Sequence, residues 1–103
     1  MQNTMDLAEF EAKATQVSET LRAIGNARRL MVLCKLIEHG EVTVGDLAED
    51  IGLSLSACSQ HLGRMRDAGL VTSRRDSQML WYRIADARVE ALLATLYDLY
   101  CKD

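Results

Sequence analysis

The apolar residues of this chain recur every three or four positions over most of its length, which predicts a mostly helical protein. Glycines and capping residues mark the ends of these repeats, because Gly closes helices while Asn, Thr and Asp side chains accept hydrogen bonds from a first turn. The caps are Asn26, Thr43 and Asp86, and the closing glycines are Gly25, Gly40 and Gly69. The predicted helices cover residues 7–24, 27–39, 44–51, 55–68 and 87–100.

A different pattern separates the last two helices. Residues 70–75 and 79–84 are short β-rich runs around a polar tip at 76–78, which predicts a small hairpin although the tip has neither Gly nor Asn. The short third helix, a glycine-containing turn and the fourth helix make a helix-turn-helix, and a hairpin directly after it is a wing. We therefore predict one winged helix-turn-helix domain over residues 1–103, mostly α, with the order α-α-α-α-β-β-α.

The fourth predicted helix has one apolar and one polar face. Its apolar face is formed by Leu55, Cys58, Leu62 and Met65. The polar face carries Ser56, Ser59, Gln60 and Arg64, with His61 on the flank. Small, hydrogen-bonding side chains on a helix backed by apolar residues suit the major groove of DNA, and the alternative is an ordinary amphipathic helix that meets only water. Near the tip of the wing, Arg74, Arg75 and Gln78 are candidates for contacts with phosphate or the minor groove.

The net charge of −3 is unevenly spread along the chain. Residues 54–84 contain five arginines and two aspartates, so this third carries +3 and the remainder carries −6. A basic segment on an acidic chain is typical of a DNA-reading face on a soluble scaffold, and a chance excess of three charges is the alternative.

Composition narrows the function classes further. No apolar run approaches the roughly 18 residues that span a bilayer, and no signal peptide is recognisable, so we expect a cytoplasmic protein without a membrane partner. The sequence has no Gly-rich phosphate loop and no spacing that pairs a nucleophile with a base, so we expect neither an enzyme nor a bound cofactor. The three cysteines do not indicate a disulfide framework in a reducing compartment; they are packing residues or redox-active ones.

The helices at the two ends carry more apolar surface than a core of this size needs, which predicts a dimer. The first helix has a narrow seam in which apolar residues alternate at steps of three and four. The seam is Leu7, Phe10, Ala14, Val17, Leu21 and Ile24, and the matching stripe on the last helix is Leu92, Leu96 and Leu99.

Over essentially its full length the chain resembles the ArsR family of bacterial winged-helix repressors. The resemblance rests on the segments 26–30 (Asn-Ala-Arg-Arg-Leu), 59–62 (Ser-Gln-His-Leu), 68–71 (Ala-Gly-Leu-Val) and 81–84 (Trp-Tyr-Arg-Ile). It implies a homodimer that binds an inverted repeat in operator DNA and releases it when an inducer binds. The chain departs from the family in having Ala27 where a proline is frequent.

Two cysteines make the chain most similar to the persulfide-sensing branch of this family, called BigR, SqrR or HlyU. These are Cys34, in the second helix, and Cys101, at the end of the last. The resemblance implies that the last helix packs on the second, so that the two thiols are neighbours and form a redox-sensing pair answering to reactive sulfur species. Without the resemblance, Cys34 would be a core residue and Cys101 a tail residue. Cys58 lies outside the family pattern and is interpreted as a small buried filler.

Other switches and partners remain open alternatives. General oxidants are one, and metal is another, because many ArsR relatives sense metal. Their paired-cysteine motif would fall near residues 42–47, which contain no cysteine, and the last helix contains no histidine, so we predict no metal site. A winged-helix module that binds another protein instead of DNA is the competing class of function.

Overall fold

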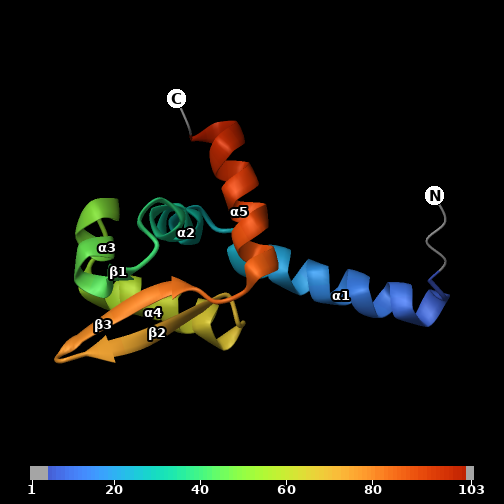
Figure 1. Ribbon diagram of the computed structural model, residues 1–103, viewed down its shortest axis with the longest axis horizontal. Coiled ribbons are helices and arrows are strands. Elements are labelled where there is room, and N and C mark those ends of the chain that lie inside the picture. The colour runs from blue at the N-terminus through green and yellow to red at the C-terminus, as the bar shows by residue number, and fades with distance from the viewer. Residues whose placement is uncertain (1–4, 102–103) are drawn as a thin grey trace.

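The structure is a computed structural model that describes residues 5–101, and its elements follow the predicted order with one addition (Figure 1). The five helices and three strands in this range are α1 (Leu7–Ile24), α2 (Ala27–His39), β1 (Val42–Thr43), α3 (Val44–Ile51), α4 (Leu55–Asp67), β2 (Val71–Asp76), β3 (Met79–Ile84) and α5 (Ala87–Tyr100).

The predicted caps hold the helix starts. The side chain of Asn26 accepts hydrogen bonds from the backbone N–H groups of Arg28 and Arg29, and the hydroxyl of Thr43 accepts one from Asp46. Asp86 does the same for the first turn of α5. Because each helix leaves its first N–H groups without a partner in the helix, these side chains fix where α2, α3 and α5 begin.

The addition is β1, a strand of two residues that joins the wing to the body. It pairs antiparallel with β3, so the sheet order is β1-β3-β2. The wing itself has a shorter tip than predicted: Asp76 pairs with Met79, which leaves a loop of two residues instead of three. Ser77 adopts a positive φ of 59° there, a conformation that usually selects Gly or Asn.

The core lies where α2, α3, α4 and α5 meet the inner side of the sheet. Leu33, Leu47, Leu62 and Leu93 are fully buried in it, and Tyr82 covers it from the wing. Cys58 has no exposed surface and packs among these residues, in agreement with the interpretation as a filler. The prediction for Leu55 was wrong: this first residue of α4 is 57% exposed, because it precedes the part of the helix that reaches the core.

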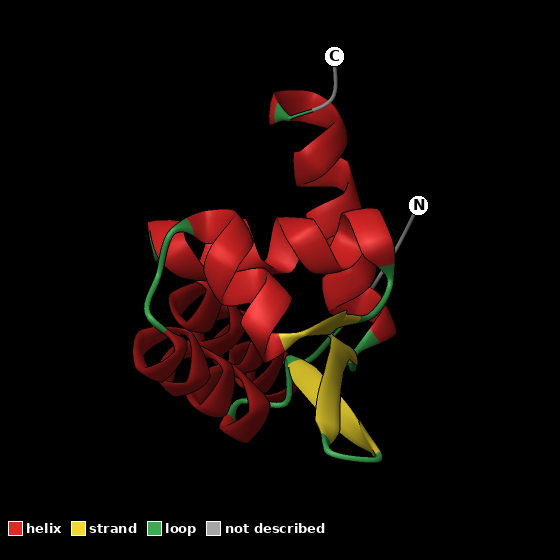
Figure 2. Cartoon of the chain, turned by 90° about the vertical axis from the view of Figure 1, so that its left-hand side faces the viewer, coloured by secondary structure: helices red, strands yellow, loops and turns green. Residues whose placement is uncertain are grey.

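Helix α1 extends away from the body, so the chain measures 49 × 32 × 22 Å (Figure 1). Figure 2 shows that the wing and the C-terminal end of α5 point in opposite directions. Most of the seam of α1 is exposed: Leu7, Phe10, Val17 and Leu21 each keep more than half of their surface, whereas Ile24 at its end is buried in the core.

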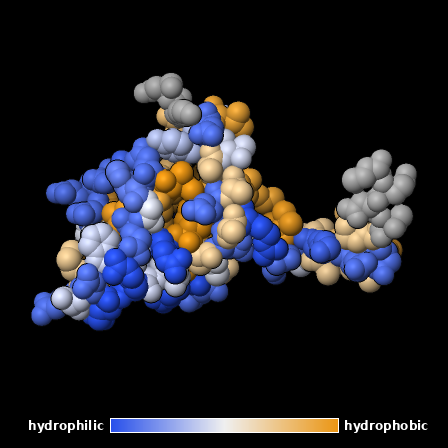
Figure 3. Space-filling view, in the orientation of Figure 1, coloured by the Kyte–Doolittle hydropathy of each residue, from blue (hydrophilic) through white to orange (hydrophobic). Residues whose placement is uncertain are grey.

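The apolar stripe of α5 lies partly against the core and partly in solvent. Leu96 is half-buried and packs against the core of its own chain, whereas Leu99 is 70% exposed. Figure 3 shows apolar side chains gathered on both sides of α5. Within residues 5–101, no helix has the length and hydrophobicity needed to cross a membrane.

Candidate functional site

The polar face of α4 is presented to solvent by the elements around it. Thr43 begins α3, Gly52 closes that helix in the left-handed conformation, and the hydroxyl of Ser54 accepts a hydrogen bond from Ala57 to begin α4. Met65 and Leu62 on the inner side have no exposed surface, so the opposite face must point outward.

The residues predicted to read DNA lie on that outward face. They are exposed, and none of their side chains makes a hydrogen bond with another described residue, so their donors and acceptors are free for a ligand. They are Ser56, Ser59, Gln60 and Arg64.

His61 differs from these four residues because it is half-buried and already has a partner. The guanidinium Nε of Arg29, in the first turn of α2, donates a hydrogen bond to Nδ1 of His61 at 3.3 Å. Burial lowers the pKa of the imidazole, and the nearby charges of Arg29, Arg64 and Arg28 lower it further. His61 is therefore neutral at neutral pH. No local signal in the sequence could reveal this contact, which joins residues 32 positions apart.

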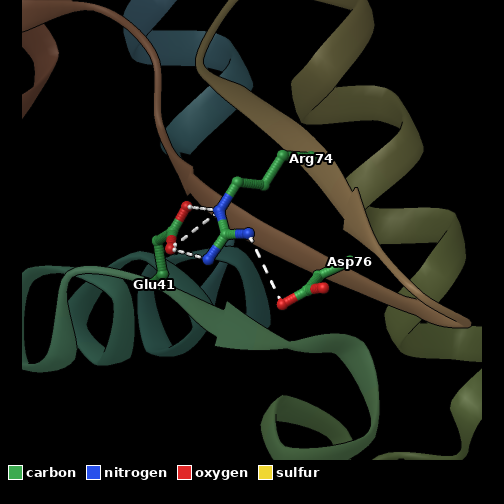
Figure 4. A network of polar contacts seen from close by, with 3 residues as sticks. All are labelled: Glu41, Arg74 and Asp76. Carbon is green, nitrogen blue, oxygen red and sulfur yellow. Dashed lines mark hydrogen bonds and ion pairs between the residues drawn. The ribbon is translucent and has the colours of Figure 1, made fainter.

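The wing presents one paired and one unpaired arginine. Figure 4 shows the guanidinium of Arg74 directed at the carboxylate of Glu41, to which Nε and Nη2 donate hydrogen bonds of 2.9–3.1 Å. Asp76 lies 4.0 Å away on the other side, and the guanidinium carbon of Arg74 is 5.8 Å from the centre of the Trp81 ring. These contacts hold the middle of the wing against the segment after α2.

Glu41 was missed by the sequence reasoning, and its pairing changes what Arg74 can do. Hydrogen bonds from Arg74 lower the pKa of Glu41, so its carboxylate stays ionised and balances the arginine charge. Arg75 and Gln78 are exposed and have no hydrogen-bond or ion-pair partner among residues 5–101. Of the predicted wing contacts, these two are free to meet a ligand, and Arg74 is free only if it leaves Glu41.

The structure brings Cys34 and Cys101 together. They lie where the end of α5 passes α2, close enough that Cys101 raises the pKa of Cys34. Cys34 is half-buried and Cys101 is exposed, and neither forms a disulfide. The two cysteines line an open pocket of about 340 Å³ together with Leu30, Met31, Lys35, Glu38, Asp50, Ile51 and Tyr97.

Acidic and aromatic side chains shape the electrostatics of this pocket. The hydroxyl of Tyr97 donates a hydrogen bond of 2.7 Å to Glu38, which joins α5 to α2 beside the thiols. This bond raises the pKa of Tyr97 and lowers that of Glu38. The pKa of Cys34 is raised to about 11, chiefly by burial, then by the neighbouring Cys101 and by the charge of Glu38. Cys34 is therefore almost entirely a thiol at neutral pH.

Metal ligands do not cluster in the described part of the chain. Among residues 5–101, no group of three or more His, Cys, Asp or Glu side chains is arranged to hold a metal ion. The dithiol has Glu38 nearby, but a structural zinc site needs four ligands.

Comparisons with known proteins identify the family. Residues 26–73 match the family described as bacterial regulatory protein, arsR family. The HTH-type transcriptional regulator YgaV of Escherichia coli is 44% identical over 93% of this chain and 97% of its own length.

Solved structures agree with this match. Reduced HlyU from Vibrio cholerae superposes with a TM-score of 0.88 at 38% identity, covering 93% of this chain and all of that one. The transcriptional repressor BigR from Xylella fastidiosa has a TM-score of 0.81 at 34% identity, covering 96% of this chain and all of that one. The fold is a winged helix-turn-helix, and the relatives that match nearly the whole chain are transcriptional regulators. The chain therefore belongs to the arsR family of bacterial regulatory proteins.

Proposed function

We propose that this protein is a cytoplasmic, homodimeric repressor that binds operator DNA through α4 and the wing and is switched by sulfur chemistry at Cys34 and Cys101. The observation that carries the proposal is the thiol pair itself, which lines one open pocket between α2 and α5 that a small reactant can enter. A relative described as a repressor and one solved in a form described as reduced support the same interpretation.

The exposed seam of α1 and the outer side of α5 support a dimer. Four large apolar residues of α1 and Leu99 of α5 face solvent in a single chain, which is unfavourable unless a second copy covers them. A twofold axis would place the two α4 helices in successive major grooves, about one helical turn apart, and so favours an inverted repeat. Arg64, if it contacts a guanine edge, is expected to contribute on the order of 1–3 kcal/mol to recognition.

The chemistry begins at the exposed thiol. The thiolate of Cys101 attacks the outer sulfur of an organic persulfide RSSH, which leaves a persulfide on Cys101 and releases the thiol RSH. A second RSSH transfers its outer sulfur to Cys34 in the same way and leaves as RSH. The Cys101 persulfide anion then attacks the Cys34 sulfur atom, forms an S–S bond to it and displaces the outer sulfur of Cys34 as hydrogen sulfide. The products are a trisulfide bridge between Cys34 and Cys101, a second RSH and hydrogen sulfide, so sulfur, hydrogen and electrons balance.

We expect a bridge with additional sulfur to form in preference to a direct disulfide. A direct bond requires the two sulfur atoms to approach to about 2.05 Å, whereas the end sulfur atoms of a bent trisulfide are about 3.3 Å apart. Packed helices have axes about 8–10 Å apart, so a chain with one more sulfur atom spans the contact between α2 and α5 with less strain. Peroxide, which supplies no sulfur, would have to draw α5 and α2 closer together.

The test compares three cysteine variants on a defined DNA probe. A duplex selected from a random pool by the reduced protein serves as the operator, and anisotropy measures binding before and after treatment with an alkyl persulfide or with peroxide. We expect persulfide to release the wild type and to add one sulfur, less two hydrogens, in a cross-link between the Cys34 and Cys101 peptides. Cys34→Ser and Cys101→Ser should stay bound, and Cys58→Ala should behave as the wild type.

Three outcomes would overturn parts of the proposal. Release of Cys34→Ser or Cys101→Ser by persulfide would exclude the dithiol switch. An equal response to peroxide would replace sulfur sensing with general oxidant sensing. Absence of salt-dependent binding to a random duplex at low salt would favour a protein partner over DNA, because a basic face must bind DNA electrostatically.

A further inference from the structure

Arg29 connects three helices at the edge of the DNA-reading surface. Its Nε donates to Nδ1 of His61 on α4, at 3.3 Å, while its Nη1 donates to the carbonyl oxygen of Ala23 at the end of α1, at 3.1 Å. Asn26 fixes the backbone of the same residue by capping α2. The guanidinium is therefore held from both sides, and it fixes one edge of the His61 ring.

This contact determines which nitrogen of His61 carries hydrogen. Arginine is always a donor, so Nδ1 must supply a lone pair, and the hydrogen of the neutral ring is on Nε2. Nε2 has no hydrogen-bond partner among residues 5–101 and is not a buried atom, so it is a free donor. His61 directly follows Gln60 and lies about one helical turn before Arg64. Both of these neighbours are on the exposed face of α4.

The charged groups near the His61 ring are all cations, so they oppose its protonation. A second proton would have to sit on Nδ1, opposite the N–H of Arg29. The other charged groups that face the ring are Arg28 on α2 and Arg64 on α4, and both are cations. None of these three arginines has a carboxylate within ion-pair distance among the described residues.

We infer that Arg29 is a positioning residue for DNA recognition, which holds His61 as a neutral imidazole with its Nε2–H directed at a hydrogen-bond acceptor of DNA. This inference rests on the proposed DNA binding and adds to it a residue of α2, outside the helix-turn-helix and the wing. The acceptor is the N7 or O6 edge of a purine, or a phosphate oxygen. A neutral N–H group forms a directional hydrogen bond without adding charge, so its contribution to DNA affinity does not depend on salt concentration.

Binding measurements on two probes test the inference and distinguish the two acceptors. One probe is a duplex selected from a random pool by the wild-type protein, and the other is a random duplex of equal length. Arg29→Ala and His61→Leu are each expected to lower affinity for the selected duplex about tenfold, the size of one specific contact. Because His61→Leu leaves the charge unchanged, a loss in this variant that is confined to the selected duplex identifies a base edge, and an equal loss on both probes identifies a phosphate.

Matched variants separate the positioning role of Arg29 from the effect of its charge and from any effect on folding. Arg28→Ala removes a cation from the same turn but leaves the His61 contact intact, so it should weaken both probes alike and reduce the salt dependence. Arg29→Lys keeps a donor and should retain most of the affinity. In NMR titrations of the His61 ring, Arg29→Ala should raise the midpoint more than Arg28→Ala does, a change that altered packing alone would not produce.

A double-mutant cycle completes the test. If Arg29 acts through His61, then Arg29→Ala in the His61→Leu background should cost much less than tenfold. A full additional tenfold loss, or an unchanged His61 titration in Arg29→Ala, would overturn the inference while leaving DNA binding in place. A wild-type protein that binds neither duplex would instead overturn the proposed function, and the role of Arg29 with it.

Discussion

The dithiol is expected to contain one slow and one accessible cysteine, because Cys34 and Cys101 differ in their surroundings. The pKa of Cys34 is raised from 9.0 to about 11, so its thiolate fraction near pH 7.5 is about 100-fold below that of an ordinary cysteine. Since the thiolate is the nucleophile, alkylation by iodoacetamide should be slowed by about the same factor. The rate should increase about tenfold per pH unit until the pH approaches 11.

Removing the neighbour is the perturbation that tests this explanation. Burial is the largest cause of the raised pKa, followed by Cys101, so Cys101→Ser should lower the pKa of Cys34 without returning it to 9.0. Alkylation of Cys34 should become faster in that variant, yet remain slower than in the unfolded chain.

Pulsed alkylation followed by mass spectrometry measures each cysteine in one experiment. The unfolded chain gives the intrinsic rates, and the buried Cys58, whose pKa is also raised by burial, is an internal reference for a protected thiol. The reasoning is refuted if Cys34 in the folded protein reacts at the rate of the unfolded chain. It is also refuted if Cys101→Ser slows the reaction of Cys34.

The two arginines of the wing should differ in salt-dependent binding. Arg75→Ala should flatten the salt dependence of random-duplex binding more than Arg74→Ala, because Glu41 already balances the charge of Arg74; equal slopes would contradict the ion pair. Leu99→Glu should dissociate the dimer in sedimentation while the monomer stays folded, since Leu99 is exposed in one chain. The free energy of unfolding should fall as pH drops below about 6.5, because the unfolded chain protonates a His61 whose pKa is lowered in the fold. Chemical denaturation of His61→Gln should lack that part of the pH dependence.

Local signals in the sequence were sufficient to predict the helices. The caps at Asn26 and Thr43 and the closing Gly40 coincide with changes in the apolar repeat, so each boundary had two independent indications. The strand β1 had none, because two residues carry no alternation and Val42 becomes a strand residue only by pairing with Tyr82.

Predictions that depended on tertiary contacts were less complete. A broad apolar stripe on α5 does not say which part faces its own core: Leu96 packs partly against that core, whereas Leu99 is exposed. The pairs Arg74–Glu41 and Arg29–His61 join residues more than 30 positions apart, and their polar side chains have no pattern that indicates a partner. The proximity of Cys34 and Cys101 was expected from the family resemblance, since no local pattern relates residues 67 positions apart.

Helix α2 connects the thiol pair to both parts of the proposed DNA-binding surface. Cys34 lies five residues after Arg29, about 7.5 Å along the helix axis, and Glu41 follows the end of the same helix. A sulfur bridge that moves α2 relative to α5 should therefore disturb two contacts at once, Arg29 with His61 on α4 and Glu41 with Arg74 on the wing. We expect bridge formation to shift the NMR signals of His61 and of the Arg74 side chain without unfolding the chain. If both signals stay fixed while DNA affinity falls, then the switch acts through the dimer contact instead, since α5 also carries the exposed Leu99.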